Sequence, residues 1–193
     1  MTALGVAVGI PVDCEPPSRP LPAVHSAGSE PHHVRLPGLG EFEQRCWEQF
    51  TEAAAFLYAA AHRQLLHVHG LTLLDVMLLR LLANSRKGSA RMGELAQALA
   101  VIPSRVSQQI RRLEAQGLVR RSKSSDDRRV VIASITIEGQ AKLKPVLRTY
   151  ARGVRALYLN PLTRQQISAL GDSSRRIDSA LRDAGAPPKL SDK

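Results

Sequence analysis

The sequence predicts a mainly α-helical protein with a small β-hairpin wing, arranged as a winged helix-turn-helix with flanking dimerisation helices. Apolar residues recur every three or four positions through most of residues 40–183, which is the period of an amphipathic helix. Residues 91–136 instead combine a short helix, a tight turn, a second helix and two β-prone segments rich in basic residues. A helix-turn-helix followed by a hairpin is a geometry that holds side chains against DNA.

The positive charge is concentrated in the same segment. The 193 residues include 27 Lys and Arg and 17 Asp and Glu, for a formal net charge of +10. Residues 91–129 hold nine basic and four acidic side chains, a net of +5, whereas residues 1–39 have a net of −1. This distribution predicts double-stranded DNA as the partner. It disfavours a membrane, because the basic groups do not line one amphipathic helix and no run of about 18 apolar residues occurs.

The two ends of the chain differ from the middle in composition. Residues 1–39 contain seven of the twelve prolines and four glycines without an apolar period, so we expect a disordered arm there. Residues 184–193 are predicted to form a disordered tail. Cys14 and Cys46 provide no disulfide framework, and the apolar start lacks a basic segment, so a cytoplasmic location is expected.

Between these ends, residues 40–183 are predicted to form one domain. Its dimerisation helices are expected at about 40–68 and 138–183, around a winged helix-turn-helix at about 72–137. The first helix is predicted to end at Gly70, because glycine readily adopts the left-handed conformation that terminates helices.

Capping residues mark the boundaries of the other elements. Thr72 and Asp75 form a predicted capping box for an apolar second helix, and Thr163 and Gln166 form another for the last helix. Pro103 suits the first turn of a helix, because its missing N–H needs no partner there. The elements expected in between are a polar turn at 84–88, a helix at 92–99, a turn at 100–102, a helix from 103 to Gly117, strands at 118–123 and 130–136, and a long helix from Thr136 to a break at Asn160–Pro161.

The helix that begins at Pro103 has two unlike faces. Val106, Ile110 and Leu113 share one side and are predicted to attach the helix to the core. The Arg, Gln and Ser side chains opposite suit a major groove, because they form hydrogen bonds with base edges. A solvated amphipathic helix would show the same pattern, but the neighbouring helix and hairpin favour DNA contact. The exposed residues are Ser104, Gln108, Arg111, Arg112 and Ala115, with Arg105 at the flank.

The predicted hairpin is basic but carries two acids at its turn. Asp126 and Asp127 interrupt a positive run that a purely electrostatic surface would leave unbroken. We expect Asp127 to hold a neighbouring arginine in a fixed pose for a minor groove; the alternative is that the acids only favour the turn. The basic residues are Arg120, Arg121, Lys123, Arg128 and Arg129.

Several segments share their spacing with a known family: GELAQAL, SRVSQQIRRLEAQGLVRR, DDRRVVIASIT, the EGQ that follows, and the upstream GLTLLDVMLLRLL. They resemble the MarR family of winged helix-turn-helix regulators over about residues 40–183. The resemblance implies a homodimer with intertwined terminal helices and two recognition helices facing an inverted repeat. It also implies a repressor released by a small aromatic or phenolic anion, with Trp47, Tyr58, His62 and Arg63 as candidate ligand contacts.

Carried over by position, the resemblance assigns Ser104, Arg105, Ser107, Gln108 and Arg112 to the major groove and pairs Asp127 with Arg129 in the wing. Arg91 and Ile102 stand where the family usually has a capping Ser, Thr or Asp. Each missing cap costs about 1 kcal/mol unless Ser89 or Pro103 compensates. The predicted DNA contacts are Ser104, Arg105, Ser107, Gln108, Arg111, Arg112, Arg120, Lys123, Asp127, Arg128 and Arg129.

The apolar surface independently predicts a homodimer. Residues 91–136 have a small core, and the three long amphipathic helices around them carry more apolar surface than that core can cover. Two linked DNA-binding units also increase specificity through their effective concentration. We therefore expect half-sites about one helical turn apart.

Other functions have weaker support. A reactive Cys46 would make the protein a redox-sensing repressor. However, the residues around Cys46 differ from the peroxide-sensing pattern, and no second cysteine is near. His62, His67 and His69 lack a completing ligand, so we predict no metal and no cofactor. A low-specificity architectural DNA-binding protein would share the basic segment. An enzyme is disfavoured, because the sequence contains no nucleophile–base set, phosphate loop or metal motif.

Overall fold

The computed structural model describes residues 35–124, 127 and 129–185. Most of the predicted N-terminal arm and C-terminal tail lies outside the described residues. The chain divides into two compact units, residues 1–44 and 45–193. In the first unit, Arg35 forms an ion pair with Glu41 at 3.4 Å, and the Gln44 side chain accepts a hydrogen bond from the Leu36 N–H at 3.1 Å.

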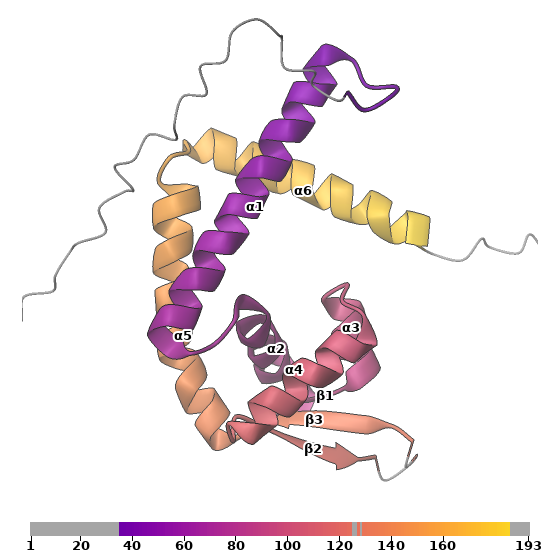
Figure 1. Cartoon of the computed structure of the whole chain (residues 1–193), viewed down its shortest axis with the longest axis vertical. Coiled ribbons are helices and arrows are strands. Elements are labelled where there is room, and N and C mark those ends of the chain that lie inside the picture. Colours follow the sequence, from indigo (N-terminus) through magenta and orange to yellow (C-terminus); the bar gives the residue numbers. More distant parts are fainter. Residues whose placement is uncertain (1–34, 125–126, 128, 186–193) are drawn as a thin grey trace, which may run out of the picture. The chain divides into compact units, whose positions relative to one another are not determined.

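The helix α1 begins in the first unit and continues into the second, which contains all the other elements (Figure 1). In chain order they are α1 (Glu41–His69), α2 (Leu73–Asn84), the 3-10 turn η1 (Arg86–Gly88), β1 (Ser89–Arg91), α3 (Met92–Ala98), α4 (Pro103–Ala115), β2 (Val119–Lys123), β3 (Val131–Ile135), α5 (Ile137–Val154), the π-helical segment η2 (Arg155–Leu159) and α6 (Arg164–Gly185). The predicted mainly helical fold with a small wing is confirmed.

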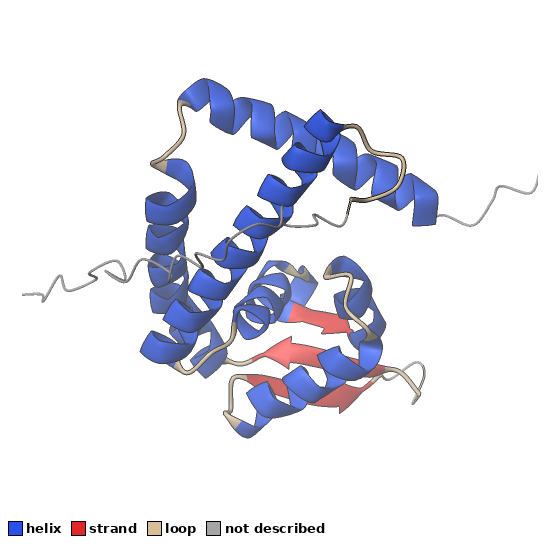
Figure 2. Ribbon diagram, turned by 45° about the horizontal axis from the view of Figure 1, so that its top comes forward, coloured by secondary structure: helices blue, strands red, loops and turns tan. Residues whose placement is uncertain are grey.

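The strands form one antiparallel sheet in the order β1-β3-β2, beside α2, α3 and α4 (Figure 2). β2 and β3 are the predicted hairpin. β1 was not predicted: the sequence indicated only a polar turn before α3. Three residues pair with β3, in a register that sets Ala90 opposite Ala133, and Ser89 Oγ lies 2.8 Å from Ser134 Oγ. The wing is therefore fastened to the segment that precedes α3.

The core of this unit is built mainly from α2 and α4. α2 is buried nearly all round, as predicted, through Leu73, Leu74, Val76, Leu78, Leu79 and Leu82. Val106, Ile110 and Leu113 of α4 are fully buried, which confirms the predicted inward face. Burial of each such side chain stabilises the fold by about 1.5–3 kcal/mol. α4 is therefore held rigidly, with its opposite face free.

The predicted capping boxes are present. Thr72 Oγ1 accepts a hydrogen bond from the Asp75 N–H at 3.1 Å, and Asp75 Oδ2 accepts one from the Thr72 N–H at 2.7 Å. Thr163 and Gln166 exchange equivalent bonds of 3.3 and 2.8 Å before α6. Gly70 has a φ of +69°, which ends α1 as expected.

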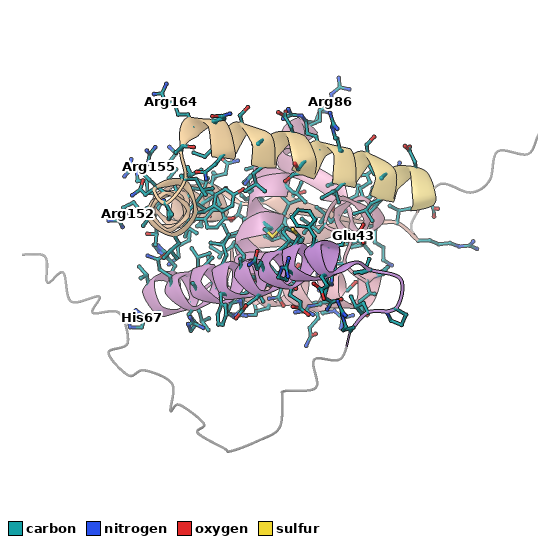
Figure 3. All side chains as sticks on the ribbon, turned by 90° about the horizontal axis from the view of Figure 1, so that it is seen from above. Glu43, His67, Arg86, Arg152, Arg155 and Arg164 are labelled. Carbon is teal, nitrogen blue, oxygen red and sulfur yellow. The ribbon has the colours of Figure 1, made fainter. Side chains whose placement is uncertain are left out.

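The helices α5 and α6 are less deeply packed. α5 buries Leu143, Val146 and Thr149 and continues as η2 to the predicted break at Asn160. Arg152, Arg155 and Arg164 extend outward from this part of the chain (Figure 3). Within the described segments no single helix is long and apolar enough to span a membrane; α1 and α2 meet that criterion only as a pair, bent by 80° at their junction.

Candidate nucleic-acid interface

A left-handed residue makes the turn between α3 and α4. The Ala100 N–H donates to Gln97 O at 3.2 Å, and the Val101 N–H donates to Ala96 O at 3.0 Å. Ala100 has a φ of +51°, a conformation that favours glycine. The chain thereby reverses within the predicted turn, and α4 begins at Pro103.

The starts of α3 and α4 lack side-chain caps on their N-cap residues, Arg91 and Ile102. Glu94 Oε2 instead accepts a hydrogen bond from the Arg91 N–H at 2.9 Å. Pro103 occupies the first turn of α4, where it removes one unpaired donor. Ser89 does not serve as a cap, because its hydroxyl lies against Ser134 in the sheet.

The free face of α4 carries the polar side chains predicted for a major groove. Ser104, Arg105, Gln108 and Arg111 are exposed, and Ser107 is half-buried. A hollow of about 450 Å³ at the start of α4 is lined by Ile102, Ser104, Arg105, Gln108 and Gln109. These donors and acceptors project from a rigidly anchored helix.

Arg112, also predicted to contact the bases, forms contacts within the protein. Its Nη2 donates to the Gly70 carbonyl oxygen at 3.1 Å, and its Nη1 lies 3.6 Å from Asp75 Oδ2. Both partners belong to the junction of α1 and α2. The guanidinium therefore contacts a buried carboxylate and a helix-terminal carbonyl, and its predicted contact with the bases stays a prediction.

A basic groove of about 690 Å³ lies between α3, α4 and the wing. Four arginines line it against one acid, Glu94, so its charge suits a phosphate backbone. Arg91 and Arg121 were missing from the predicted contacts. Arg91 was assigned only to the N-cap position of a helix, and charge alone did not distinguish Arg121 from the other basic residues of the hairpin. The lining residues are Arg91, Met92, Gly93, Glu94, Gln97, Ser107, Arg111, Arg121, Arg129, Val130 and Val131.

The wing tip is shaped by Asp127. Its Oδ1 accepts a hydrogen bond from the Arg129 N–H at 2.8 Å, and its carbonyl oxygen accepts one from the Val130 N–H at 2.9 Å. The carboxylate thus stabilises the turn and fixes the backbone from which the exposed Arg129 side chain projects. Arg120 and Lys123 are exposed on β2, while Arg128 and Asp126 lie outside the described residues.

Arg121 joins the wing to α4. Its Nε and Nη2 each lie 2.6 Å from Glu114 Oε2, and its N–H donates to Glu114 Oε1 at 3.0 Å. The backbone and side-chain hydrogen bonds from Arg121 lower the pKa of Glu114 below its ordinary value of 4.5. The wing and α4 are therefore presented as one surface.

Two apolar pockets are lined by residues of α1 and α2. One, of about 350 Å³, is lined by α1, α2 and the end of α5, including Leu57, Tyr58 and Tyr150. The other, of about 460 Å³, includes Tyr58, Ile102 and Arg105. Of the four predicted ligand contacts, Tyr58 lines both, and His62 stacks on it with ring centroids 6.1 Å apart. Trp47 and Arg63 line neither.

The remaining histidines and Cys46 lie outside these pockets. His69 Nε2 lies 2.9 Å from Thr149 Oγ1, and burial, followed by the charges of Lys142 and Arg152, lowers its pKa below 6.5. Among the described residues, no group of three or more His, Cys, Asp or Glu side chains is arranged to hold a metal ion. Cys46 is exposed, and redox sensing by it stays a prediction.

The sequence and fold are similar to those of known regulators. A sequence model of the MarR family matches residues 71–131. The HTH-type transcriptional repressor MdtR of Bacillus subtilis (strain 168) is 37% identical over 87 residues, which span 45% of this chain and 56% of that relative.

Two solved structures from Streptomyces coelicolor extend the likeness over most of the chain. A MarR family transcriptional regulator in complex with DNA is 32% identical, with a TM-score of 0.72, and the match covers 80% of this chain and 95% of that one. AbsC, another MarR family transcriptional regulator, is 30% identical, with a TM-score of 0.70 and coverage of 75% and 97%.

Proposed function

The chain belongs to the MarR family of transcriptional regulators, and from that premise we propose that it is a dimeric repressor that recognises an inverted repeat in double-stranded DNA. The basic groove between α3, α4 and the wing carries this proposal, because it combines phosphate-binding arginines with groove-facing polar side chains on one rigid surface.

Within this proposal the two parts of the surface have different roles. Gln108 and Arg105 of α4 contact base edges, since amide and guanidinium groups match the donor and acceptor pattern of adenine and guanine. Arg91, Arg111 and the wing's Arg120 and Lys123 contact phosphates. Arg129, held at the Asp127 turn, enters the minor groove beside the half-site.

Exposed apolar side chains support a homodimer. Several large apolar residues on α1, in η2 and on α6 are about half exposed or more, which is costly for a monomer in water. We propose that a second copy covers them and sets the spacing of the two recognition helices. They include Trp47, Phe50, Phe56, Leu66, Val68, Leu157, Ile177 and Leu181.

The placement of Arg105 supports release by a small aromatic or phenolic anion. Arg105 lines the 460 Å³ pocket with Tyr58, Leu74 and Met77, and it also lines the polar hollow at the start of α4. An anion whose ring occupies the apolar part of the pocket would draw the guanidinium toward its carboxylate or phenolate. DNA would then lose one contact of α4.

Selection from a random DNA library, followed by footprinting on the protein's own promoter, tests the main proposal. We expect an enriched inverted repeat, bound about 10³-fold or more tightly than competitor DNA at one stated salt concentration. A preference near unity would instead support the architectural alternative. Sedimentation at micromolar concentration checks the dimer, and a monomer there would contradict it.

A further inference from the structure

We infer that Arg112 and Gln109 are positioning residues. They fix the orientation of α4 through hydrogen bonds and an ion pair to the α1–α2 junction (residues 70–75), a set of contacts called the grip below. Sequence discrimination depends on the grip, although neither residue touches DNA. The inference rests on the proposed function, because it assigns specificity to a contact on the far side of the recognition helix. It also relates the DNA-binding face to the segment that borders both apolar pockets.

Two side chains of α4 reach the junction. Gln109 Nε2 lies 3.1 Å from Thr72 Oγ1, the N-cap hydroxyl of α2. One turn further along α4, Arg112 spans the Gly70 carbonyl and the Asp75 carboxylate, at 3.1 and 3.6 Å. These contacts attach α4 to the residues that end α1 and begin α2, and they supplement the apolar packing with directional bonds.

The buried carboxylate of Asp75 makes the grip specific for arginine. Its side chain has 0% exposure, and Oδ2 accepts hydrogen bonds from the N–H and hydroxyl of Thr72 at 2.7 and 2.8 Å. Oδ1 is buried without a hydrogen-bond partner among the described residues. A buried carboxylate needs a nearby cation, and Arg112 supplies it while using a second nitrogen for Gly70.

The junction separates the two helices that line the pockets. Tyr58 lies on α1, whereas Leu73 and Met77 lie on α2 just beyond Thr72. A ligand that alters the angle between α1 and α2 therefore acts on the anchor points of Gln109 and Arg112.

Competition binding with Arg112→Ala and Arg111→Ala separates positioning from contact. Arg111 is exposed and lines the basic groove, so its removal should lower the slope of log K against log salt by about 0.9. Arg112→Ala should leave the slope unchanged and reduce the ratio of operator to competitor affinity about tenfold. A reduced slope with an unchanged ratio for Arg112→Ala would overturn the inference.

Asp75→Asn provides the second arm, because a fully buried side chain cannot touch DNA. It should reproduce the loss of discrimination, and the double variant Asp75→Asn with Arg112→Ala should lose no more than either single variant. Additive losses would contradict a shared role. If Arg112→Ala does not fold, Arg112→Lys and Gln109→Ala replace it, since each removes part of the grip and leaves Asp75 with a cation.

Amide hydrogen exchange without DNA distinguishes this inference from the proposed function. Exchange in α4 should accelerate in Arg112→Ala and Gln109→Ala but not in Arg111→Ala. Unchanged protection of the α4 amides in all variants would overturn the positioning role, even if the wild type binds a specific operator. If the wild type enriches no DNA sequence, the proposed function fails, and the exchange data alone decide whether the grip exists.

Discussion

The carboxylate of Glu114 holds the guanidinium of Arg121 at 2.6 Å and so joins the last turn of α4 to the first strand of the wing. The Arg121 backbone N–H adds a third contact to the same carboxylate. One acid and one base, seven residues apart in the chain, therefore fix the position of the wing relative to the end of α4.

Glu114→Gln should flatten the dependence of stability on pH in acid. The pKa of Glu114 is lowered in the fold, mainly by the Arg121 backbone hydrogen bond. The pair therefore stabilises the protein above the unfolded pKa, and this stability is lost as pH falls through the folded pKa. Urea unfolding between about pH 6 and about pH 3 measures the effect. An equal flattening in Glu52→Gln, an exposed α1 carboxylate, would contradict the assignment.

His69→Gln should reduce the stability that the protein loses as the pH falls just below neutrality. Burial, then the charges of Lys142 and Arg152, lower the pKa of His69 below 6.5, so the unfolded chain takes up a proton first. The wild type should become less stable as pH falls from about 7.5 to about 5.5, and the variant should lose less over that interval. His67→Gln alters an exposed neighbour and is the matched control; identical curves for both variants would count against His69.

Ala100→Gly should stabilise the helix-turn-helix. Ala100 has a φ of +51°, where an L side chain is strained and glycine is not. We expect a gain of up to about 1 kcal/mol in the free energy of unfolding, measured by thermal denaturation. Ala98→Gly, at the last residue of α3, should instead lose stability, by up to about 1 kcal/mol. Equal losses in the two variants would show that Ala100 carries no strain.

Gly139→Ala should destabilise the junction between α5 and the sheet. An added Cβ would overlap the Leu118 carbonyl oxygen and lie 2.9 Å from Ile135 Cγ1. Overpacking against backbone costs about 1–3 kcal/mol, which a shift in the urea midpoint would reveal. Gly93→Ala serves as the control, because its Cβ would meet no atom within 4 Å. A neutral Gly139→Ala would mean that α5 moves freely relative to β2.

Arg129→Ala and Gln108→Ala should separate affinity from sequence preference. Loss of Arg129 removes one cation from the DNA-binding surface, so binding to all sequences should weaken and the salt slope should fall by about 0.9. Loss of Gln108 should change the preferred base at one position of each half-site, at about 1–3 kcal/mol. Competition assays with single-base operator variants measure both. A uniform loss from Gln108→Ala would remove it from the base contacts.

The sequence predicts correctly those elements that depend on residues close together in the chain. The Thr72–Asp75 box, the inward Val106, Ile110 and Leu113, and the break at Asn160 each depend on residues within a few positions of one another. β1 was not predicted because its three residues pair with β3, whose Ser134 lies 45 residues after Ser89 in the chain. No period or turn signal distinguishes such a short segment.

The contacts of Arg112 within the protein were not predicted, for the same reason. A helical projection assigns it to the face opposite Val106, but its direction is decided by Gly70 and Asp75, about 40 positions earlier in the chain. Arg91 was missed for a related reason. Its role as an N-cap is visible in the sequence, whereas its position on the rim of the groove depends on how the wing folds back.

The strand order also has a consequence for solubility. β3 lies between β1 and β2, so the most apolar of the three strands has backbone partners on both sides. β1 and β2 are the two edge strands, and β2 carries Arg120, Arg121 and Lys123. Charged edge strands resist the addition of a strand from another molecule. Replacing Arg120, Arg121 and Lys123 with neutral residues should therefore promote intermolecular β-sheet aggregation.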